Sequence, residues 1–162
     1  MLTTARGVLS LRPETDADEQ FLFRLFAATK ADEMTLMPLD DVGKDFLLRT
    51  QFRSMNASYR QQFPAARFDI VELNGVPIGR LITDVQPDQV YYVDIALLPE
   101  TQQGGIATAL MQAVLQEPAG LGVPARVKVL MHNVASLRLC QRIGFTVRTE
   151  EPPFLELEWR AG

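Results

Sequence analysis

The sequence predicts an α/β (α+β) domain in which about four helices flank a central mixed, mostly antiparallel, twisted sheet of six to seven strands. Three observations point to this class. Asn74-Gly75, a pair that type I′ hairpin turns prefer, separates two apolar runs. Val90–Leu98 is rich in β-branched and aromatic residues, which is typical of a strand buried on both faces. A glycine-rich turn then opens an amphipathic helix, which implies one right-handed crossover.

The elements are expected in the order β-α-α-β-β-β-α-β-α-β-β. The expected strands are Val8–Leu11, Phe68–Leu73, Val76–Ile82, Val90–Leu98, Val127–Met131, Phe145–Val147 and Phe154–Trp159. The expected helices are one that Thr15 or Asp16 caps and that carries Phe21–Phe26, one over Phe46–Arg53, one from Gly105 to near Pro118 and one over Ser136–Ile143. Met37–Gly43 and Gly120–Gly122 are expected to be loops.

Composition limits the classes of protein that the chain can represent. The 162 residues are 47% hydrophobic and 22% charged, which predicts one soluble folded domain over residues 1–162. The net charge of -4 argues against a nucleic-acid partner. The single cysteine, Cys140, excludes an intrachain disulfide, and with a single histidine, His132, we expect no metal site. We expect no membrane span and no signal peptide, and hence a cytoplasmic protein.

A strand, a glycine turn and a helix N-terminus follow one another between Val93 and Leu110. Free backbone N–H groups and the helix dipole make such a junction an anion site. Gly104 and Gly105 leave the backbone open to a phosphate, because a side chain there would keep it away. By itself the pattern is equally consistent with an ordinary strand–helix loop.

Two motifs sharpen this interpretation. Gln102-x-x-Gly105-x-Ala107 resembles the pyrophosphate-binding signature of the GNAT superfamily of N-acetyltransferases. Asn133–Phe145 is similar to the second cofactor motif of that family, N-x-x-A-x-x-L-Y-x-x-x-G-F. The resemblance implies the GNAT fold, with a sheet splayed at its central parallel strands. It also implies an enzyme that transfers an acetyl group from acetyl-CoA to a primary amine, on a small molecule or a peptide, by direct attack in a ternary complex.

The resemblance also implies the cofactor contacts. Backbone groups of residues 95–97 would pair with the pantetheine arm, and a bulge is expected in this strand. Backbone N–H groups from Gln103 to Thr108 would hold the pyrophosphate. Asn133, which could equally be only a helix cap, would bind the pantetheine. The full predicted set is Ile95, Ala96, Leu97, Leu98, Gln102, Gln103, Gly104, Gly105, Ile106, Ala107, Thr108, Asn133, Ser136 and Cys140.

Cys140 occupies the position at which many family members carry a tyrosine that protonates the leaving thiolate. A thiol, with an ordinary pKa of about 8.5, is acidic enough for this role, but its side chain is shorter. Cys140 is therefore either a proton donor or a small apolar residue that fills the core. A covalent acyl-cysteine route would need a base beside the sulfur. The backbone N–H of Leu97 is the implied donor to the oxyanion.

The attacking amine must lose a proton, so a base is required. The candidate bases on the central strands are Tyr91, Tyr92, Asp94 and Glu72. Strand alternation predicts Tyr92 and Asp94 on one face and Tyr91 and Val93 on the other. Tyr91 matches the position of a glutamate base in part of the family, but tyrosine is a poor base at neutral pH. A water that relays the proton to Asp94 or Glu72 is no less well supported, and each residue has a purely structural alternative.

Two other functions remain open at this stage. The absent tyrosine motivates a catalytically impaired acyl-CoA-binding module. A structural or oligomer-forming domain, in which the glycines only form turns, is the third. A homodimer is also compatible with the sequence. The cluster of Arg49, Arg53, Tyr59 and Arg60 either shapes the acceptor pocket or forms one solvated helix face.

Overall fold

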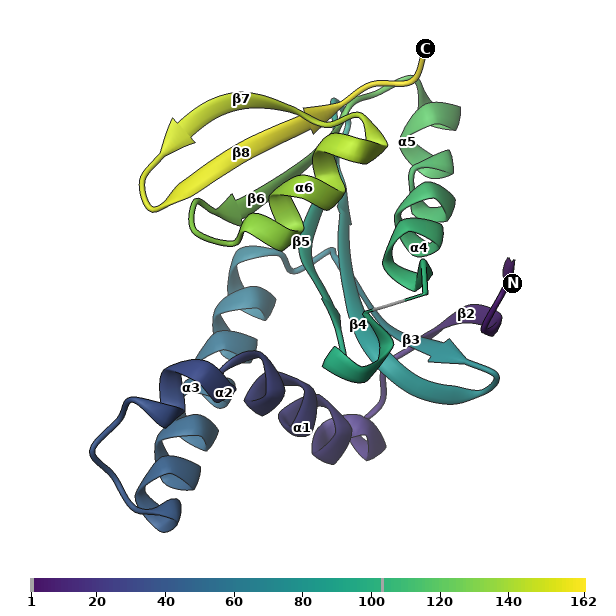
Figure 1. The fold of residues 1–162 in the computed structure, drawn as a ribbon. Helices are drawn as coiled ribbons and strands as arrows, with labels where there is room; N and C mark the ends of the chain where they lie inside the picture. Colours follow the sequence, from purple (N-terminus) through teal and green to yellow (C-terminus); the bar gives the residue numbers. More distant parts are fainter. Residues whose placement is uncertain (1, 103) are drawn as a thin grey trace.

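The computed structural model describes residues 2–102 and 104–162. One mixed sheet runs through it in the order β1-β2-β3-β4-β5-β6-β8-β7 (Figure 1). Its strands are β1 (Leu2–Thr4), β2 (Gly7–Pro13), β3 (Arg67–Leu73), β4 (Val76–Val85), β5 (Val90–Leu97), β6 (Ala125–Leu130), β7 (Thr146–Glu151) and β8 (Phe154–Trp159). Within the described sheet the neighbouring strands are antiparallel, apart from the parallel pair β5 and β6. The predicted fold class is confirmed.

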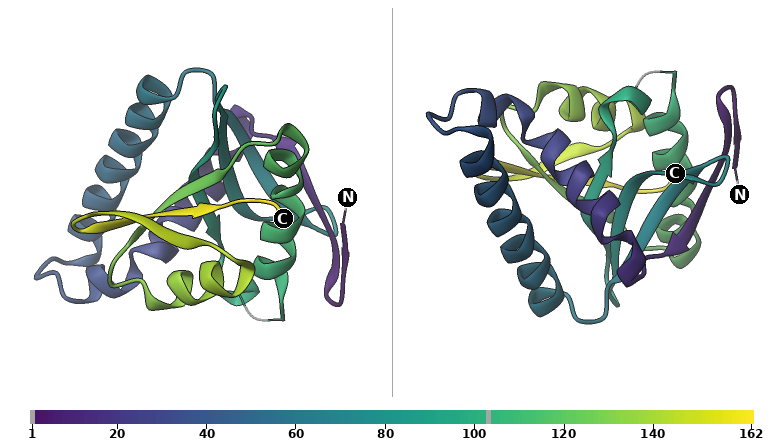
Figure 2. Two further views of the ribbon diagram at one scale, coloured as in Figure 1. Left: turned by 90° about the horizontal axis from the view of Figure 1, so that it is seen from above. Right: turned by 90° about the horizontal axis from the view of Figure 1, so that it is seen from below.

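Helices cover both faces of the sheet. They are α1 (Glu19–Thr29), α2 (Ala31–Thr35), α3 (Asp41–Gln62), α4 (Ile106–Val114), α5 (Gln116–Leu121) and α6 (Val134–Ile143). Figure 2 shows α3 and α4 on opposite sides of β3 and β4. Helix α6 contacts α4, and α1 contacts α3 and β4. The sheet therefore separates two layers, which are called here the α3 face and the α4 face.

Several local predictions were wrong, because the described residues form eight strands and six α-helices, one of them the unexpected α2, and not six to seven strands and about four helices. The sequence analysis missed β1, a three-residue edge strand that pairs Leu2 with Leu9 and is too short to show a pattern. It also expected a loop after Pro118, whereas α5 continues to Leu121. Pro118 is the third residue of α5, and a proline is tolerated in the first turn because the N–H there has no partner within the helix. Helix α3 begins inside the expected loop, where the Asp40 carboxylate accepts the Gly43 N–H at 2.8 Å.

Each face has its own apolar core. The larger lies on the α4 face, and its buried members include Leu81, Ile106 and Leu110. The smaller one consists of Leu22, Phe26, Phe52 and Ile70. Burial of one such side chain stabilises the fold by roughly 1.5–3 kcal/mol, so both layers are firmly packed on the sheet.

The start of α1 is fixed by an ion pair. The Arg12 guanidinium donates to both carboxylate oxygens of Asp18, at 2.7 and 2.8 Å, and to Glu72 at 2.9 Å. Asp18 also accepts the Thr15 N–H at 2.8 Å. The hydrogen bonds from Arg12 lower the pKa of Asp18 to about 2. Charge therefore anchors the first helix to β2.

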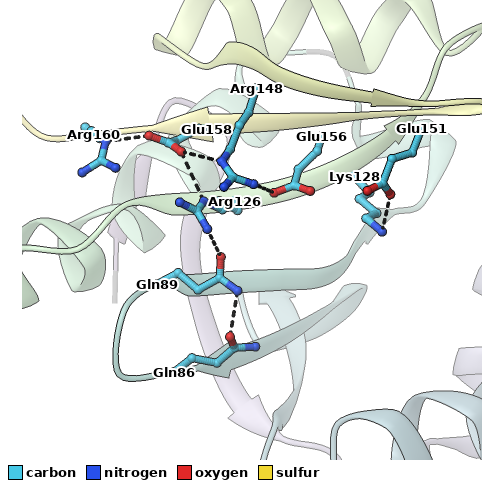
Figure 3. Close-up of polar contacts among 9 residues, drawn as sticks. All are labelled: Gln86, Gln89, Arg126, Lys128, Arg148, Glu151, Glu156, Glu158 and Arg160. Atoms are coloured by element: carbon cyan, nitrogen blue, oxygen red, sulfur yellow. Dashed lines mark hydrogen bonds and ion pairs between the residues drawn. The ribbon is translucent and has the colours of Figure 1, made fainter.

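A polar network covers the α3 face of the last three strands (Figure 3). Its members are Gln86, Gln89, Arg126, Lys128, Arg148, Glu151, Glu156, Glu158 and Arg160. Glu158 binds Arg126 at 3.2 Å and Arg148 at 3.4 Å, which joins β6, β7 and β8. Since Arg126 is the register partner of Tyr91, this charged surface continues onto the central strand.

Within residues 2–102 and 104–162, no helix is long and apolar enough to cross a membrane. The same ranges contain no group of three or more His, Cys, Asp or Glu side chains that could hold a metal ion.

Candidate active site

A β-bulge interrupts β5 at Val93. Ile82 of β4 pairs with Asp94, whereas the next residue, Thr83, pairs with Tyr92. Two residues of β5 therefore oppose one step of β4, and Val93 is the extra residue. A bulge bends its strand and increases the local twist. This is the bulge that the resemblance implied.

Beyond the bulge, β5 and β6 separate. Their parallel pairing joins Val90–Tyr92 to Ala125–Val127, although β5 continues to Leu97 and β6 to Leu130. The second halves of the two strands diverge in Figure 1. The predicted splay is therefore present and leaves a gap in the strand pairing in the middle of the sheet.

The hydrogen-bond pattern shows which backbone groups face this gap. The Leu98 N–H donates to the Ile78 carbonyl at 2.8 Å, and opposite residues in an antiparallel ladder alternate between bonded and non-bonded pairs. Backbone groups of Ala96 are therefore directed to β4, whereas those of Ile95 and Leu97 are directed away from it. The Ile95 N–H acts on the Asp94 carboxylate and the Leu97 carbonyl accepts from Gln102, so the Ile95 carbonyl and the Leu97 N–H are the groups that a ligand between β5 and β6 could meet.

Gly79 lets β4 approach β5 closely at this point. A Cβ on Gly79 would collide with the Ala96 carbonyl oxygen and would come within 2.6 Å of Leu97 Cδ2. The neighbouring backbone cannot yield as a flexible side chain could. The absence of a side chain at position 79 therefore helps to fix the position of Leu97.

The glycine turn connects Leu97 to α4. Gly104 and Gly105 have φ angles of +85° and +80°, a left-handed conformation that glycine adopts without strain. The Gln102 side chain donates to the Leu97 carbonyl at 3.2 Å, and the Thr101 hydroxyl donates to the Leu98 carbonyl at 2.7 Å. The turn is thus hydrogen-bonded to the end of β5. The prediction for Gln103 lies outside the described residues.

The first turn of α4 presents backbone donors at this junction. The Ala109 N–H donates to the Gly105 carbonyl at 2.9 Å and is the first bond of the helix. The N–H groups of residues 106–108 therefore have no partner within the helix. A Cβ on Gly105 would meet nothing within 4 Å, so open space lies before the turn. The open space at Gly105 and the N–H groups of residues 106–108 are the features that an anionic group bound at this turn would use.

Asn133 caps α6, the helix that follows β6. Its side-chain oxygen accepts the Ser136 N–H at 3.3 Å, and Gly144 ends the helix at a φ of +116°. The structural alternative for Asn133 is therefore observed. Its contact with pantetheine, and that of Ser136, remain predictions.

Cys140 lies in the core on the inner side of α6. It is 6% exposed and belongs to the same apolar cluster as Leu97, Leu110 and Phe145. Burial raises the pKa of the thiol to about 11. The thiol therefore stays protonated at neutral pH and fills space, as one of the two alternatives expected. Its role as a proton donor remains a prediction.

The bulge overturns the predicted arrangement of the candidate bases. The Tyr92 hydroxyl donates to the Val114 carbonyl at 2.8 Å, so Tyr92 lies on the α4 face. Asp94 and Phe68 both pair with Ile82 of β4, so their side chains lie on the same face of the sheet. The centroid of the Phe68 ring lies 4.1 Å from the guanidinium carbon of Arg60 on α3. Asp94 therefore lies on the α3 face, opposite to Tyr92. The prediction that these two residues share a face was wrong, because the extra residue in β5 shifts the alternation by one.

Asp94 now has Tyr91 as its neighbour on the α3 face. The Tyr91 ring packs on Phe63 at the end of α3, with 5.6 Å between ring centroids. Burial raises the pKa of Asp94 to about 6, although nearby Arg80 and the Ile95 N–H oppose the shift. Burial and the charge of Asp94 raise the pKa of Tyr59 to about 12, and burial also raises that of Tyr91. Both tyrosines are therefore neutral, and Asp94 is the group of this cluster that titrates near neutral pH.

The sequence analysis missed the charged network behind Asp94. Arg80, 3% exposed, lies 3.2 Å from Glu14 and donates to the Asn56 side-chain oxygen of α3 at 2.6 Å. Glu14 also binds Arg60 of α3 at 2.5 Å. A charged residue within the apolar strand Val76–Ile82 was the signal that could have revealed it, since a buried arginine needs partners.

Glu72 is not brought to this cluster. It is bound to Arg12. It also lies four residues along β3 from Phe68, which is the residue of β3 that lies level with Asp94 across β4. The residues of the predicted α3 cluster also separate. Arg49 pairs with Asp45 and stacks on Phe23, whereas Tyr59 and Arg60 face the sheet. Glu72 is therefore a weaker candidate base than Asp94.

Comparison with known proteins identifies the arrangement. The family model described as "Acetyltransferase (GNAT) family" matches residues 37–145, and no curated protein sequence matches the chain significantly.

Solved structures share the fold. The PaiA N-acetyltransferase of Thermoplasma acidophilum, in complex with coenzyme A, is 16% identical over 95% of this chain and 99% of that one, with a TM-score of 0.68. The Escherichia coli ribosomal-protein-S18-alanine N-acetyltransferase is 18% identical over 96% and 97%, with a TM-score of 0.64. The Campylobacter jejuni N-acetyltransferase PseH, in complex with acetyl coenzyme A, is 16% identical over 96% and 100%, with a TM-score of 0.62.

These identities are low enough that the solved structures show the fold alone, whereas the family model covers well over half of the chain. The match confirms the family that the two sequence motifs predicted. The chain therefore belongs to the acetyltransferase (GNAT) family, whose members are acetyl-CoA-dependent N-acetyltransferases.

Proposed function

We propose that this chain transfers an acetyl group from acetyl-CoA to a primary amine by direct attack in a ternary complex. The bulge at Val93 is the observation that carries the proposal. It turns the Asp94 carboxylate onto the α3 face, and it lies where the pairing of β5 with β6 ends. On this proposal, the thioester and the base for the amine occupy adjacent parts of one strand.

The cofactor region consists of the gap between β5 and β6 and the turn from Gln102 to Thr108. When bound, acetyl-CoA supplies the activated acetyl group. The first-turn N–H groups of α4 would bind its pyrophosphate, and the Ile95 carbonyl and the Leu97 N–H would meet its pantetheine arm. The Leu97 N–H is the proposed donor to the carbonyl oxygen that gains charge during transfer. Much of the rate enhancement would come from holding the two reactants together.

The acceptor region consists of Asp94, Tyr91, Tyr59 and Arg80. An alkylammonium has a pKa near 10.4 and must release a proton before or as it attacks. Asp94 is ionised above about pH 6, so we propose that it accepts this proton, directly or through a water. The tyrosines are neutral and can donate hydrogen bonds to a bound acceptor.

One observation favours the second candidate, a catalytically impaired acyl-CoA-binding module. Cys140 is buried and its pKa is about 11, so it is a poor donor to a leaving thiolate. Direct protonation by solvent or by the acceptor's own proton would make such a donor unnecessary. The two candidates differ in turnover and not in cofactor binding.

The test combines binding and turnover on the same purified chain. Calorimetry measures CoA affinity, and release of free CoA thiol is followed with acetyl-CoA and a panel of small primary amines and peptides with free N-termini or lysines. We expect binding and, for at least one amine, thiol release matched by a 42 Da mass gain of the acceptor, the mass of one acetyl group replacing hydrogen. Binding without turnover across the panel would support the module. Absence of both would contradict the proposal.

We further propose that residues 1–162 form one acyltransferase domain, because a single sheet includes strands from Leu2 to Trp159. The cytoplasmic location and the homodimer expected from the sequence remain predictions. Size-exclusion chromatography with light scattering measures the latter directly.

A further inference from the structure

The turn that is proposed to hold the pyrophosphate brings no positive charge of its own. From Pro99 to Leu115 the sequence contains neither lysine nor arginine, and Glu100 adds a negative charge. The helix N-terminus supplies the equivalent of roughly half an elementary charge. CoA carries a pyrophosphate and a 3′-phosphate, so its charge exceeds what this turn alone can neutralise.

A cation from the other end of the chain lies against this turn. Gly104 would, with a Cβ, come within 2.6 Å of Arg6 Cδ, 3.3 Å of Cγ and 3.7 Å of Nε. The aliphatic part of the Arg6 side chain therefore packs directly on the Gly104 backbone. Arg6 is exposed, so a ligand at the N-terminal end of α4 can reach its guanidinium.

The hairpin that carries Arg6 is held in place by hydrogen bonds. The Thr4 hydroxyl donates to the Gly7 carbonyl at 2.8 Å and accepts the Arg6 N–H at 3.2 Å. Asn74, in the turn between β3 and β4, accepts the Val8 N–H at 2.9 Å through its side chain and donates its own N–H to the Val8 carbonyl at 2.9 Å. The backbone of the hairpin that carries Arg6 is thus fixed to the sheet.

We infer that Arg6 binds a phosphate group of CoA, supplying from the far end of the chain the charge that the glycine turn lacks. This inference rests on the proposed function, because it requires CoA at the turn. Arginine suits the role, since its planar guanidinium donates two parallel hydrogen bonds to phosphate oxygens. It also gives Gly104 a second reason to be glycine, because any side chain there would displace the Arg6 stem.

Calorimetric titration with CoA tests the inference on the full chain. Arg6→Gln keeps two of the three methylenes and removes the charge, and Arg6→Lys keeps the aliphatic stem and the charge. Arg24→Gln, an exposed arginine of α1 on the α3 face, is the matched control. We expect the dissociation constant to rise about 10-fold in Arg6→Gln, equivalent to about 1.4 kcal/mol, to be largely restored in Arg6→Lys and to be unchanged in Arg24→Gln.

Two further measurements show which phosphate Arg6 binds and whether a negative result contradicts only this inference or also the proposed function. With 3′-dephospho-CoA, loss of the Arg6→Gln effect assigns the 3′-phosphate, and its persistence assigns the pyrophosphate. Salt should weaken binding by the unaltered chain more steeply than by Arg6→Gln, as expected when one ionic contact is removed. Equal CoA affinity in Arg6→Gln and the unaltered chain, with equal melting temperatures, would overturn the inference alone. An unaltered chain that binds no CoA would overturn the proposed function and this inference with it.

Discussion

The proposed cofactor region and the proposed acceptor region share β5, but different kinds of chemical group form them. We propose that the cofactor region acts mainly through backbone groups and apolar side chains, from Leu97 through Gly105 into α4, with Arg6 as its proposed cation. The acceptor region consists of ionisable and polar side chains, with Asp94 in front of the buried pair Arg80 and Glu14. Binding in the first should depend on backbone conformation, and chemistry in the second should depend on protonation.

The difference has a physical basis. Backbone donors at a helix N-terminus do not titrate, so they serve a ligand that is anionic at every physiological pH. A base must instead change its charge near the working pH, and burial raises the pKa of the Asp94 carboxylate into that range. The bulge at Val93 allows one strand to serve both purposes.

The largest effect is expected at Asp94. Asp94→Asn removes the proposed base, and we expect kcat to fall about 100-fold or more while CoA affinity stays within about 2-fold. The Asp69→Asn variant is the matched control, because burial also raises the pKa of Asp69 and its side chain lies outside the acceptor region. A 100-fold loss in both variants, or in neither, would remove the distinction between the two regions.

The pH profile should show the same division. The carboxylate of Asp94 is protonated below a pKa of about 6, so kcat should rise as the pH increases through 6 and then level off. The affinity for 3′-dephospho-CoA, which lacks the phosphate monoester that itself titrates near pH 6, should not follow this transition. Steady-state rates and calorimetry between pH 5 and 8 measure the two curves, and coincident curves would contradict the separation of roles.

A smaller effect is expected from the backbone of the cofactor region. Gly105→Val places a β-branched residue at a φ of +80° and fills the open space before the turn, so CoA affinity should fall about 10-fold. Gly122→Val is the matched control, with a φ of +70°, open space around its Cβ and a place at the end of α5. Equal CoA affinity in the two variants would show that the turn does not hold the phosphates.

The smallest effect is expected at Cys140. Cys140→Ala removes a buried sulfur and should lower the free energy of unfolding by about 1 kcal/mol, while the turnover rate changes less than about 3-fold. Thermal unfolding and steady-state kinetics measure the two. A turnover rate that drops about 100-fold while stability is unchanged would restore Cys140 as the proton donor.

The sequence predicts more of the cofactor region than of the acceptor region. The turn from Gln102 to Thr108 and the helix cap Asn133 were predictable, because backbone conformation and capping leave local patterns of glycine and asparagine. The face of Asp94 was not, because a single bulge reverses alternation and leaves no mark in the composition of β5. The contact of Arg6 with Gly104 joins residues 98 positions apart through β1, a strand too short to predict.

The most direct test of the central claim is a crystal structure of the chain with CoA bound. The account predicts the pantetheine between β5 and β6, the pyrophosphate on the N–H groups of Ile106 to Thr108 and the thiol within reach of the Leu97 N–H and on the side of β5 that Asp94 borders. A CoA molecule bound elsewhere would contradict it. One such place is the groove of about 980 Å³ between α4 and the β1–β2 hairpin, which Leu9, Leu81 and Tyr92 line together with Gly104 and Gly105. A pantetheine that runs from the glycine turn into this groove, and not between β5 and β6, would therefore contradict the account.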